Sequence, residues 1–312
     1  MPRWRTVDFR RRRPSPETLE WVERVAGARV VAWRRMTGGV ASVVHRLTID
    51  RGDDREVLVL RQYEHRFFAH IGSDTAALVR DEFATLRAVH DAGLPAPEPV
   101  AADPDGCGSD GHPAILMTRL AGRVDVAPAD PEGWLRQIAA MAVRIHDVQI
   151  PAAPPFRKRI DAAAPVVPAS ATRPAVWDAA FGILRQRAPE PPTCFIHRDL
   201  QHFNLLWRRG RLTGVVDWAT SCTGPADFDI GHCRLNLAVL FGADWAERFR
   251  LAYEAEAGRA VDPWWDLYAV TAYSDAWRRV ITAQVAGRAP VDTTGMTARV
   301  EELLDATLGR FR

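Results

Sequence analysis

The chain has 312 residues, of which 47% are hydrophobic, so it is long enough to bury a sizeable core as one large domain or as two lobes. A net charge of +2 at pH 7 is not the profile of a nucleic-acid-binding protein. No apolar run approaches membrane-spanning length, no secretion signal opens the chain, and the four cysteines show no close metal-ligand pairing. We therefore expect a cytoplasmic protein with reduced thiols and with neither a membrane nor a nucleic-acid partner.

The N-terminal part of the chain predicts a tail followed by strands. Residues 1–20 are expected to form a tail or an initial helix, and residues 29–35 a strand. The turn that follows contains Gly38 and Gly39, which permit backbone amides to approach a phosphate, and Ser42, whose hydroxyl could donate another hydrogen bond. An ordinary hairpin turn is the alternative interpretation of the glycine pair.

The apolar pattern of residues 56–62 predicts a strand, and Arg61 interrupts its apolar end. A guanidinium in that position needs an anion. Glu82 could supply one anion, from a helix whose apolar residues recur at three- and four-residue spacing, while a nucleotide phosphate supplies another. A structural ion pair, or two separate surface charges, is the other interpretation.

The chain after residue 120 predicts a larger, mainly helical lobe. Asp130 and Pro131 form a helix start, with a capping side chain followed by proline at the first helical position. Proline and alanine dominate residues 151–174, which predicts an irregular connection, either lying over a substrate cleft or serving as a plain linker.

Two carboxylates and an amide, Asp199, Asn204 and Asp217, lie within a hairpin-sized piece of sequence. Strands at 205–207 and 212–216 would bring Asn204 and Asp217 to the same end, where their oxygens could bind one Mg²⁺. Asp199 could then orient a substrate hydroxyl and take its proton. Loop residues that cap backbone groups are the alternative, but an aspartate that ends an apolar strand needs a partner, and a metal is a good one.

In this order, these features resemble the aminoglycoside phosphotransferase family, the small-molecule branch of the protein-kinase-like fold, from about residue 29 to the C-terminal helices. The resemblance implies an α+β bilobal fold, with a small antiparallel-sheet lobe that carries one long helix and a larger, mainly helical lobe. We accordingly divide the chain into a tail (1–20), a nucleotide-binding N-lobe with its hinge (21–120), and a catalytic and substrate-binding C-lobe (121–312).

The resemblance also implies roles for single residues. It makes Asp199 the catalytic base, and Asn204 and Asp217 the metal ligands. Asp229 would brace the catalytic loop, and we expect His197 to be a buried brace as well. ATP, or alternatively GTP, would be bound with Mg²⁺ by residues of the N-lobe and hinge: Gly38, Gly39, Ser42, Arg61, Glu82, Met117 and Arg119. The one departure from the family is Arg61, since lysine usually occupies that position.

The region after Trp218 is where this family builds its acceptor pocket. Asp266 and Asp275 are candidate carboxylates for binding substrate amines there. The aromatic residues of this region would either line a pocket for an apolar or sugar-bearing substrate or form the core between helices.

The sequence therefore predicts an ATP- and Mg²⁺-dependent kinase that phosphorylates a hydroxyl of a small molecule by direct in-line transfer. An aminoglycoside-like antibiotic is the first choice of acceptor, and a macrolide, an amino alcohol or a sugar is the alternative. From another class, the chain could be a nucleotide-binding pseudokinase or regulatory module. A monomer or a homodimer would fit either function.

Overall fold

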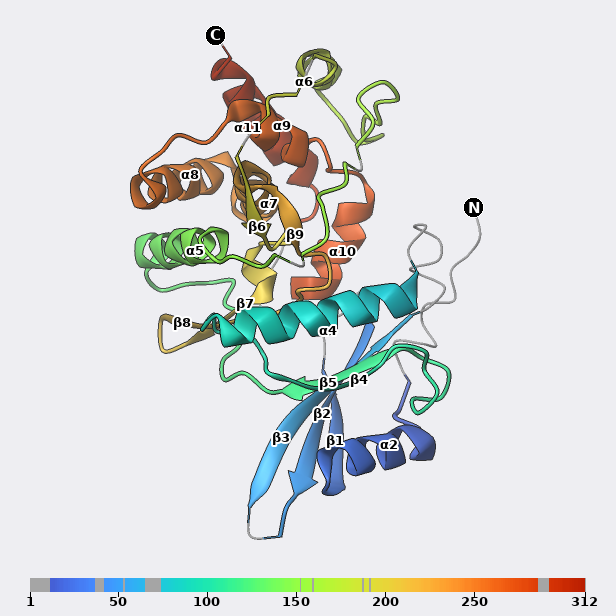
Figure 1. Ribbon diagram of the computed structural model, residues 1–312. Coiled ribbons are helices and arrows are strands. Elements are labelled where there is room, and N and C mark those ends of the chain that lie inside the picture. Colours follow the sequence, from blue (N-terminus) through green and yellow to red (C-terminus); the bar gives the residue numbers. More distant parts are fainter. Residues whose placement is uncertain are drawn as a thin grey trace. The chain divides into compact units, whose positions relative to one another are not determined.

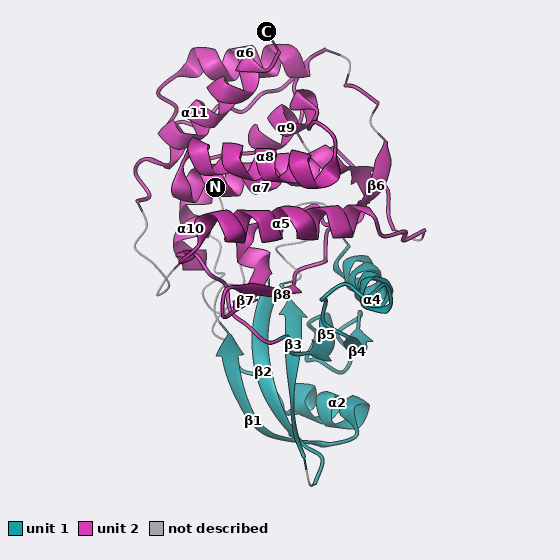
Figure 2. Ribbon diagram, turned by 90° about the vertical axis from the view of Figure 1, so that its left-hand side faces the viewer, with its two compact units in different colours: residues 1–120 teal, residues 121–312 magenta. Residues whose placement is uncertain are grey.

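The structure is a computed structural model that describes residues 12–36, 42–52, 54–64, 74–151, 153–158, 160–186, 188–190, 192–285 and 292–311 (Figure 1). The chain forms two compact units, Met1–Leu120 and Ala121–Arg312 (Figure 2). The predicted phosphate-loop residues Gly38 and Gly39 lie outside the described residues. Among the helices that are described, none is long and apolar enough to cross a membrane.

Unit 1 is built on an antiparallel sheet with the strand order β1-β2-β3-β5-β4. Its elements are α2 (Pro16–Ala26), β1 (Arg29–Met36), β2 (Ser42–Asp50), β3 (Arg55–Tyr63), α4 (Thr75–Asp91), β4 (Pro99–Asp103) and β5 (Ala114–Thr118). Alternate side chains of β2, β3 and β5 are buried in one core with Trp21 and Val22 of α2: Leu47, Ile49, Leu58, Leu60, Ala114 and Leu116.

Helix α2 begins inside the segment that the sequence assigned to a tail or an initial helix. The Ser15 side chain accepts a hydrogen bond from the amide of Thr18, and Pro16 fills the first helical position. The helix ends at Gly27, whose φ of 64° is the left-handed conformation that glycine adopts without strain. Residues 16–20 are therefore helical, which is one of the two alternatives that the sequence left open for residues 1–20.

Unit 2 is mainly helical, with two small antiparallel sheets, β6–β9 and β7–β8. Its elements are α5 (Pro131–His146), α6 (Pro174–Leu184), β6 (Thr193–Ile196), η1 (His202–Asn204), β7 (Leu205–Arg208), β8 (Arg211–Val215), β9 (Cys222–Pro225), α7 (Ala226–Phe241), α8 (Ala243–Ala257), α9 (Pro263–Val270), α10 (Ala276–Val285) and α11 (Met296–Gly309). An antiparallel sheet with helices in unit 1 and a mainly helical unit 2 confirm the predicted α+β fold class.

Helix α7 lies in the middle of unit 2, packed by α5, α8, α9 and α11, and most of its residues are buried (Figure 1). A Cβ atom added at Gly231 would lie 2.8 Å from the Cα of Asp266, so glycine is what allows α7 and α9 to pack this closely. The close packing of α7 against its neighbouring helices therefore holds its side chains in fixed positions.

The two small sheets fix the ends of two loops. Ile196 pairs with Cys222 across β6 and β9, and Leu205 pairs with Val215 across β7 and β8. Loop 197–204 and loop 216–221 therefore start and finish side by side. Part of the proline-rich connection, around Phe156, also adds to β9, since the Phe156 amide donates to the carbonyl of Thr223.

Candidate active site

Asp199 is the centre of the polar contacts in loop 197–204. Its Oδ1 accepts hydrogen bonds from Gln201 Nε2 (2.7 Å) and from His232 Nε2 (2.9 Å). Its Oδ2 accepts one from Asn204 Nδ2 (2.9 Å), which also donates to the backbone carbonyl of Asp199 (2.8 Å). The carboxylate is thus surrounded by donors while about a third of the side chain stays exposed, at 31%.

These contacts keep Asp199 ionised. Burial by itself raises the pKa of the carboxyl group, but the hydrogen bond and charge of His232, the charge of His197 and the hydrogen bond from Asn204 outweigh it. The net effect lowers the pKa of Asp199 below its usual value. A carboxylate that is ionised at neutral pH can accept a proton from a hydroxyl group.

Asp229 holds the first turn of the loop from helix α7. Its two carboxylate oxygens accept hydrogen bonds from the backbone amides of His197 (2.8 Å) and Arg198 (2.6 Å). Arg198 has a φ of 66°, a left-handed conformation that a non-glycine residue adopts only when its surroundings impose it. His146 of α5 supports the same carboxylate, with its Nε2 3.3 Å from Asp229 Oδ2. The predicted contact of Asp229 with the loop is present in the structure.

His197 joins the two loops. Its side chain is fully buried, its Nε2 lies 3.1 Å from the carbonyl oxygen of Val216, and its ring centroid lies 4.6 Å from that of Trp218. His197 thus contacts the residue before Asp217 from within the core of unit 2.

The positions of Asn204 and Asp217 fit a small oxygen-preferring cation. The carbonyl of Asn204 accepts a hydrogen bond from the Val216 amide (2.9 Å), so Asn204 lies beside the residue that precedes Asp217, at one end of the β7–β8 hairpin. Because Asn204 uses its amide nitrogen on Asp199, its side-chain oxygen is the atom that remains suited to a metal. Asp217, directly after Val216, has a φ of 70°, a further constrained residue at this end of the hairpin.

Mg²⁺ keeps several water and phosphate ligands, so one amide and one carboxylate are an adequate protein contribution. The described residues contain no group of three or more His, Cys, Asp and Glu side chains placed to hold a metal by themselves. The donor set thus fits a cation that arrives with its own phosphates.

In unit 1, Arg61 of β3 pairs with Glu82 of α4. Arg61 Nη1 donates to Glu82 Oε1 (2.8 Å), Arg61 Nε donates to the Ser42 hydroxyl (3.0 Å), and the Tyr63 hydroxyl donates to Glu82 Oε2. Both charged side chains are largely buried, with 11% of Arg61 and 1% of Glu82 exposed. The pairing that the sequence allowed is therefore present, and Ser42 acts as an acceptor within it.

The predicted hinge residues lie at the end of β5. Met117 is a buried residue in the strand, and Arg119 is exposed just after it. Nothing in their own contacts distinguishes them from other residues at a strand end.

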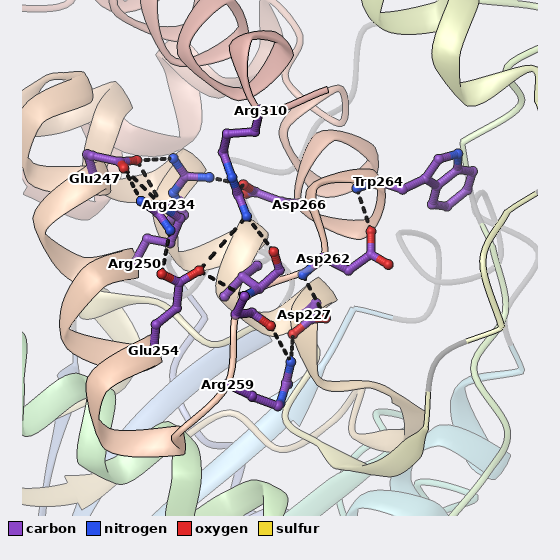
Figure 3. A network of polar contacts seen from close by, with 12 residues as sticks. Asp227, Arg234, Glu247, Arg250, Glu254, Arg259, Asp262, Trp264, Asp266 and Arg310 are labelled. Carbon is purple, nitrogen blue, oxygen red and sulfur yellow. Dashed lines mark hydrogen bonds and ion pairs between the residues drawn. The ribbon is translucent and has the colours of Figure 1, made fainter. Parts of the chain in front are cut away.

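The expectation that Asp266 binds substrate amines is wrong. Its side chain is fully buried and accepts hydrogen bonds from Arg234 Nη1 and from Arg310 Nη1 (2.8 Å). Figure 3 shows Arg234 and Arg310 directed at this carboxylate. Sequence could not reveal this, because the pairing depends on helices far apart in the chain.

Asp275 is also occupied by partners from its own unit. It accepts hydrogen bonds from the backbone amides of Ala169 (2.7 Å) and Ser170 (3.3 Å), and from the Ser170 hydroxyl. These hydrogen bonds, led by that of the hydroxyl, lower the pKa of Asp275. The aspartate fixes the end of the connection before α6.

Sequence reasoning missed His232 and Gln201 as partners of Asp199. His232 follows Asp229 by three residues on α7, so both side chains lie on one helix face. Because Asp229 was expected at the loop, the three-residue spacing from Asp229 to His232 was the signal that could have placed His232 there as well. Gln201 had no signal beyond its place two residues after Asp199.

Comparison with known proteins gives a match to the phosphotransferase enzyme family over residues 33–272. No match is found among curated proteins. One similar solved structure is a thermostable mutant of aminoglycoside phosphotransferase APH(4)-Ia in a ternary complex with AMP-PNP and hygromycin B. It is 17% identical, with 93% of this chain and 97% of that chain covered and a TM-score of 0.61.

Two other solved structures belong to proteins whose reported ligands differ. Amicoumacin kinase hAmiN, in complex with AMP-PNP, Ca2+ and Ami, is 16% identical, with 94% of this chain and 97% of that chain covered and a TM-score of 0.57. Spectinomycin phosphotransferase APH(9)-Ia, in complex with ADP and spectinomycin, is 11% identical, with 93% and 97% covered and a TM-score of 0.59. At these identities the likeness establishes the fold.

The family match extends over more than half of the chain, covers part of each unit and includes the whole of the site around Asp199. The chain therefore belongs to the phosphotransferase enzyme family, which confirms the resemblance to aminoglycoside phosphotransferases that the sequence indicated.

Proposed function

We propose that this protein transfers the γ-phosphate of ATP to a hydroxyl group of a small molecule, with Asp199 as the base. The observation that supports this most strongly is the arrangement of Asp199, Asn204 and Asp217 on two loops whose ends are fixed side by side. In a member of the phosphotransferase enzyme family, that arrangement has the parts that phosphoryl transfer requires.

Asp199 orients the acceptor hydroxyl and takes its proton as the new bond between oxygen and phosphorus forms. The bond between the γ-phosphorus and the bridging oxygen breaks, and its electron pair leaves with ADP. Asn204 and Asp217 would hold Mg²⁺, which, when bound, neutralises charge on the phosphates. Asp229 and His197 keep the loop in the conformation that presents Asp199.

For the nucleotide, we propose that Arg61 supplies the cation that pairs with a phosphate, while Glu82 and Ser42 hold its guanidinium in place. An arginine can contact two phosphate oxygens at once, so it is a chemically adequate replacement for lysine. ATP is the proposed donor, and GTP is a second donor that the same contacts would accept.

The acceptor that we propose is an antibiotic of the aminoglycoside type, because similar solved structures hold hygromycin B or spectinomycin. Asp266 and Asp275 are taken by internal partners, so we assign neither of them to substrate amines. A cavity of about 510 Å³ beside β9 is lined by Phe156, Lys158 and Trp265, among others. Macrolides, amino alcohols and sugars are therefore included in the test.

The test is a screen of these acceptors with Mg-ATP and with Mg-GTP, read by mass spectrometry, followed by Asp199→Ala on the acceptor that works. We expect transfer to fall by about 10²–10⁴-fold, as is typical when a general base is removed. Asp217→Ala should also lose transfer, and added Mg²⁺ should restore part of it. Full turnover in Asp199→Ala would contradict the proposed mechanism.

A nucleotide-binding pseudokinase or regulatory module is the second candidate, because Arg61 departs from the family pattern. Mg-ATP at 100 times its Kd should raise the free energy of unfolding by about 2.7 kcal/mol, visible as a higher Tm. A shift in Tm without turnover on any acceptor would favour this candidate over the kinase. The absence of any shift would contradict both.

A further inference from the structure

Helix α7 contacts the catalytic loop at two points one turn apart. Asp229 accepts hydrogen bonds from the backbone amides of residues 197 and 198, and the His232 ring is hydrogen-bonded to the side chain of Asp199. The His232 side chain is mostly buried, with 14% exposed. The second contact is thus made from a rigid, packed helix rather than from a loop.

The imidazole of His232 is fixed by its neighbours. Its ring is stacked with Phe228, with centroids 6.2 Å apart, and tilted against Trp277 at 6.1 Å. Asn236 Nδ2 donates to the backbone carbonyl of His232 (2.9 Å) and lies 3.2 Å from its Nε2. Because an ionised carboxylate can only accept, the proton in the contact with Asp199 belongs to His232 Nε2.

The two oxygens of Asp199 are not equivalent. Among the described residues, Oδ1 accepts from both Gln201 and His232, whereas Oδ2 accepts only from Asn204. Each carboxylate oxygen has about two lone-pair sites, so Oδ1 is saturated and Oδ2 retains one. The remaining site on Oδ2 is where a further donor can bind.

We propose that His232 is a positioning residue for the phosphoryl transfer: with Gln201 it saturates Oδ1 of Asp199 and fixes the rotation of the carboxylate, so that Oδ2 receives the acceptor proton. This inference rests on the proposed function, since it assigns a role within that reaction.

The matched test is His232→Gln against His232→Asn. The glutamine amide nitrogen reaches about as far as the imidazole Nε2, whereas the asparagine amide is shorter by one methylene. We expect His232→Gln to retain most of the wild-type kcat and His232→Asn to lose about tenfold to a hundredfold, the range of one hydrogen bond to a charged group. The KM for Mg-ATP should stay the same in both, because the contact acts on the acceptor side.

A double mutant separates positioning from a purely structural role. If His232 acts through Asp199, then adding His232→Asn to Asp199→Ala should cause no further loss of residual turnover. The control is His90→Gln, on the exposed face of α4, which should leave kcat unchanged. Circular dichroism and Tm establish that each variant is folded.

Three results would overturn the inference: equal kcat in His232→Asn and wild type, equal losses in the Gln and Asn variants, or a full further loss in the Asp199→Ala background. If the wild type turns over and Asp199→Ala abolishes this turnover, the reaction is established independently of His232. If wild type transfers no phosphate to any acceptor, the proposed function fails, and this inference fails with it.

Discussion

His202 is a polar side chain in an apolar environment. It is fully buried beside the rings of Phe203, Phe241 and Trp134, and neither of its ring nitrogens has a hydrogen-bond partner among the described residues. Burial lowers the pKa of His202 to about 3, so the imidazole is neutral in the folded protein. An unfolded chain binds a proton at this residue below about pH 6.5.

Since only the unfolded state is protonated between these two values, the stability associated with His202 is complete above about pH 6.5 and is lost as the pH falls toward about 3. The loss amounts to at most about 1.4 kcal/mol per pH unit. We predict that His202→Phe reduces this slope by one proton and raises stability at pH 7 by about 1 kcal/mol, because a buried polar group without a partner is removed. Urea unfolding between pH 4 and 7 measures both effects, and an unchanged slope would contradict the prediction.

At the scale of elements, the β7–β8 hairpin depends on a two-residue turn. Arg209 and Gly210 have φ angles of 51° and 73°, both in the left-handed region, which is the turn type that favours Asn-Gly. Gln137 of α5 holds this turn by donating to the Gly210 carbonyl (2.9 Å) and accepting from the Leu212 amide (3.0 Å). The turn fixes the register in which Leu205 pairs with Val215, so that Asn204 and Val216 lie at the same end of the hairpin.

Opposite effects are expected from substitutions at the two turn positions. Gly210→Ala should destabilise the protein by about 1 kcal/mol, because alanine is strained at this φ although no atom lies within 4 Å of the added Cβ. Arg209→Asn should stabilise it by about 0.5 kcal/mol or more, since asparagine tolerates the left-handed conformation better. Thermal unfolding of the two variants measures the difference, and a change of the same sign in both would argue against backbone strain as the cause.

At the scale of the whole molecule, a network of charges joins the helices of unit 2 (Figure 3). Arg234 of α7 is fully buried and pairs with Asp266 of α9 and Glu247 of α8, and Arg310, after α11, pairs with Asp266 as well. Burial lowers the pKa of Arg234 to about 9, although Glu247 and Glu254 oppose this, so the residue stays charged at pH 7. The helix that carries Asp229 and His232 is thereby tied to its neighbours.

We predict that Asp266→Asn destabilises the protein by about 3–5 kcal/mol, because it leaves the buried charge of Arg234 without its main partner. Asp105→Asn is the matched control: it breaks an exposed pair with Arg80, whose side chains are 63% and 54% exposed, and such pairs contribute little. Denaturant unfolding compares the two. Equal effects would show that the network does not stabilise unit 2.

Local patterns were sufficient for the fold class and for singling out the loop around Asp199. The β7–β8 hairpin, the helix around Glu82 and the start of α5 follow from apolar periodicity, turn residues and caps, all of which act over a few neighbouring residues. For the same reason, the strand and turn pattern predicted that Asn204 and Asp217 lie at one end of a hairpin, where the Val216 amide donates to the Asn204 carbonyl.

Only the tertiary structure decided which partner each charged side chain has. Asp266 and Asp275 are carboxylates in the region expected to bind substrate, but each is hydrogen-bonded within unit 2: Asp266 to a residue more than thirty positions away and Asp275 to one more than a hundred positions away. The contact of His232 with Asp199 likewise depends on the packing of α7 against the loop. The sequence gives the type of ionisable group at each position, whereas its protonation state and its availability depend on burial and on neighbours that distant parts of the chain supply.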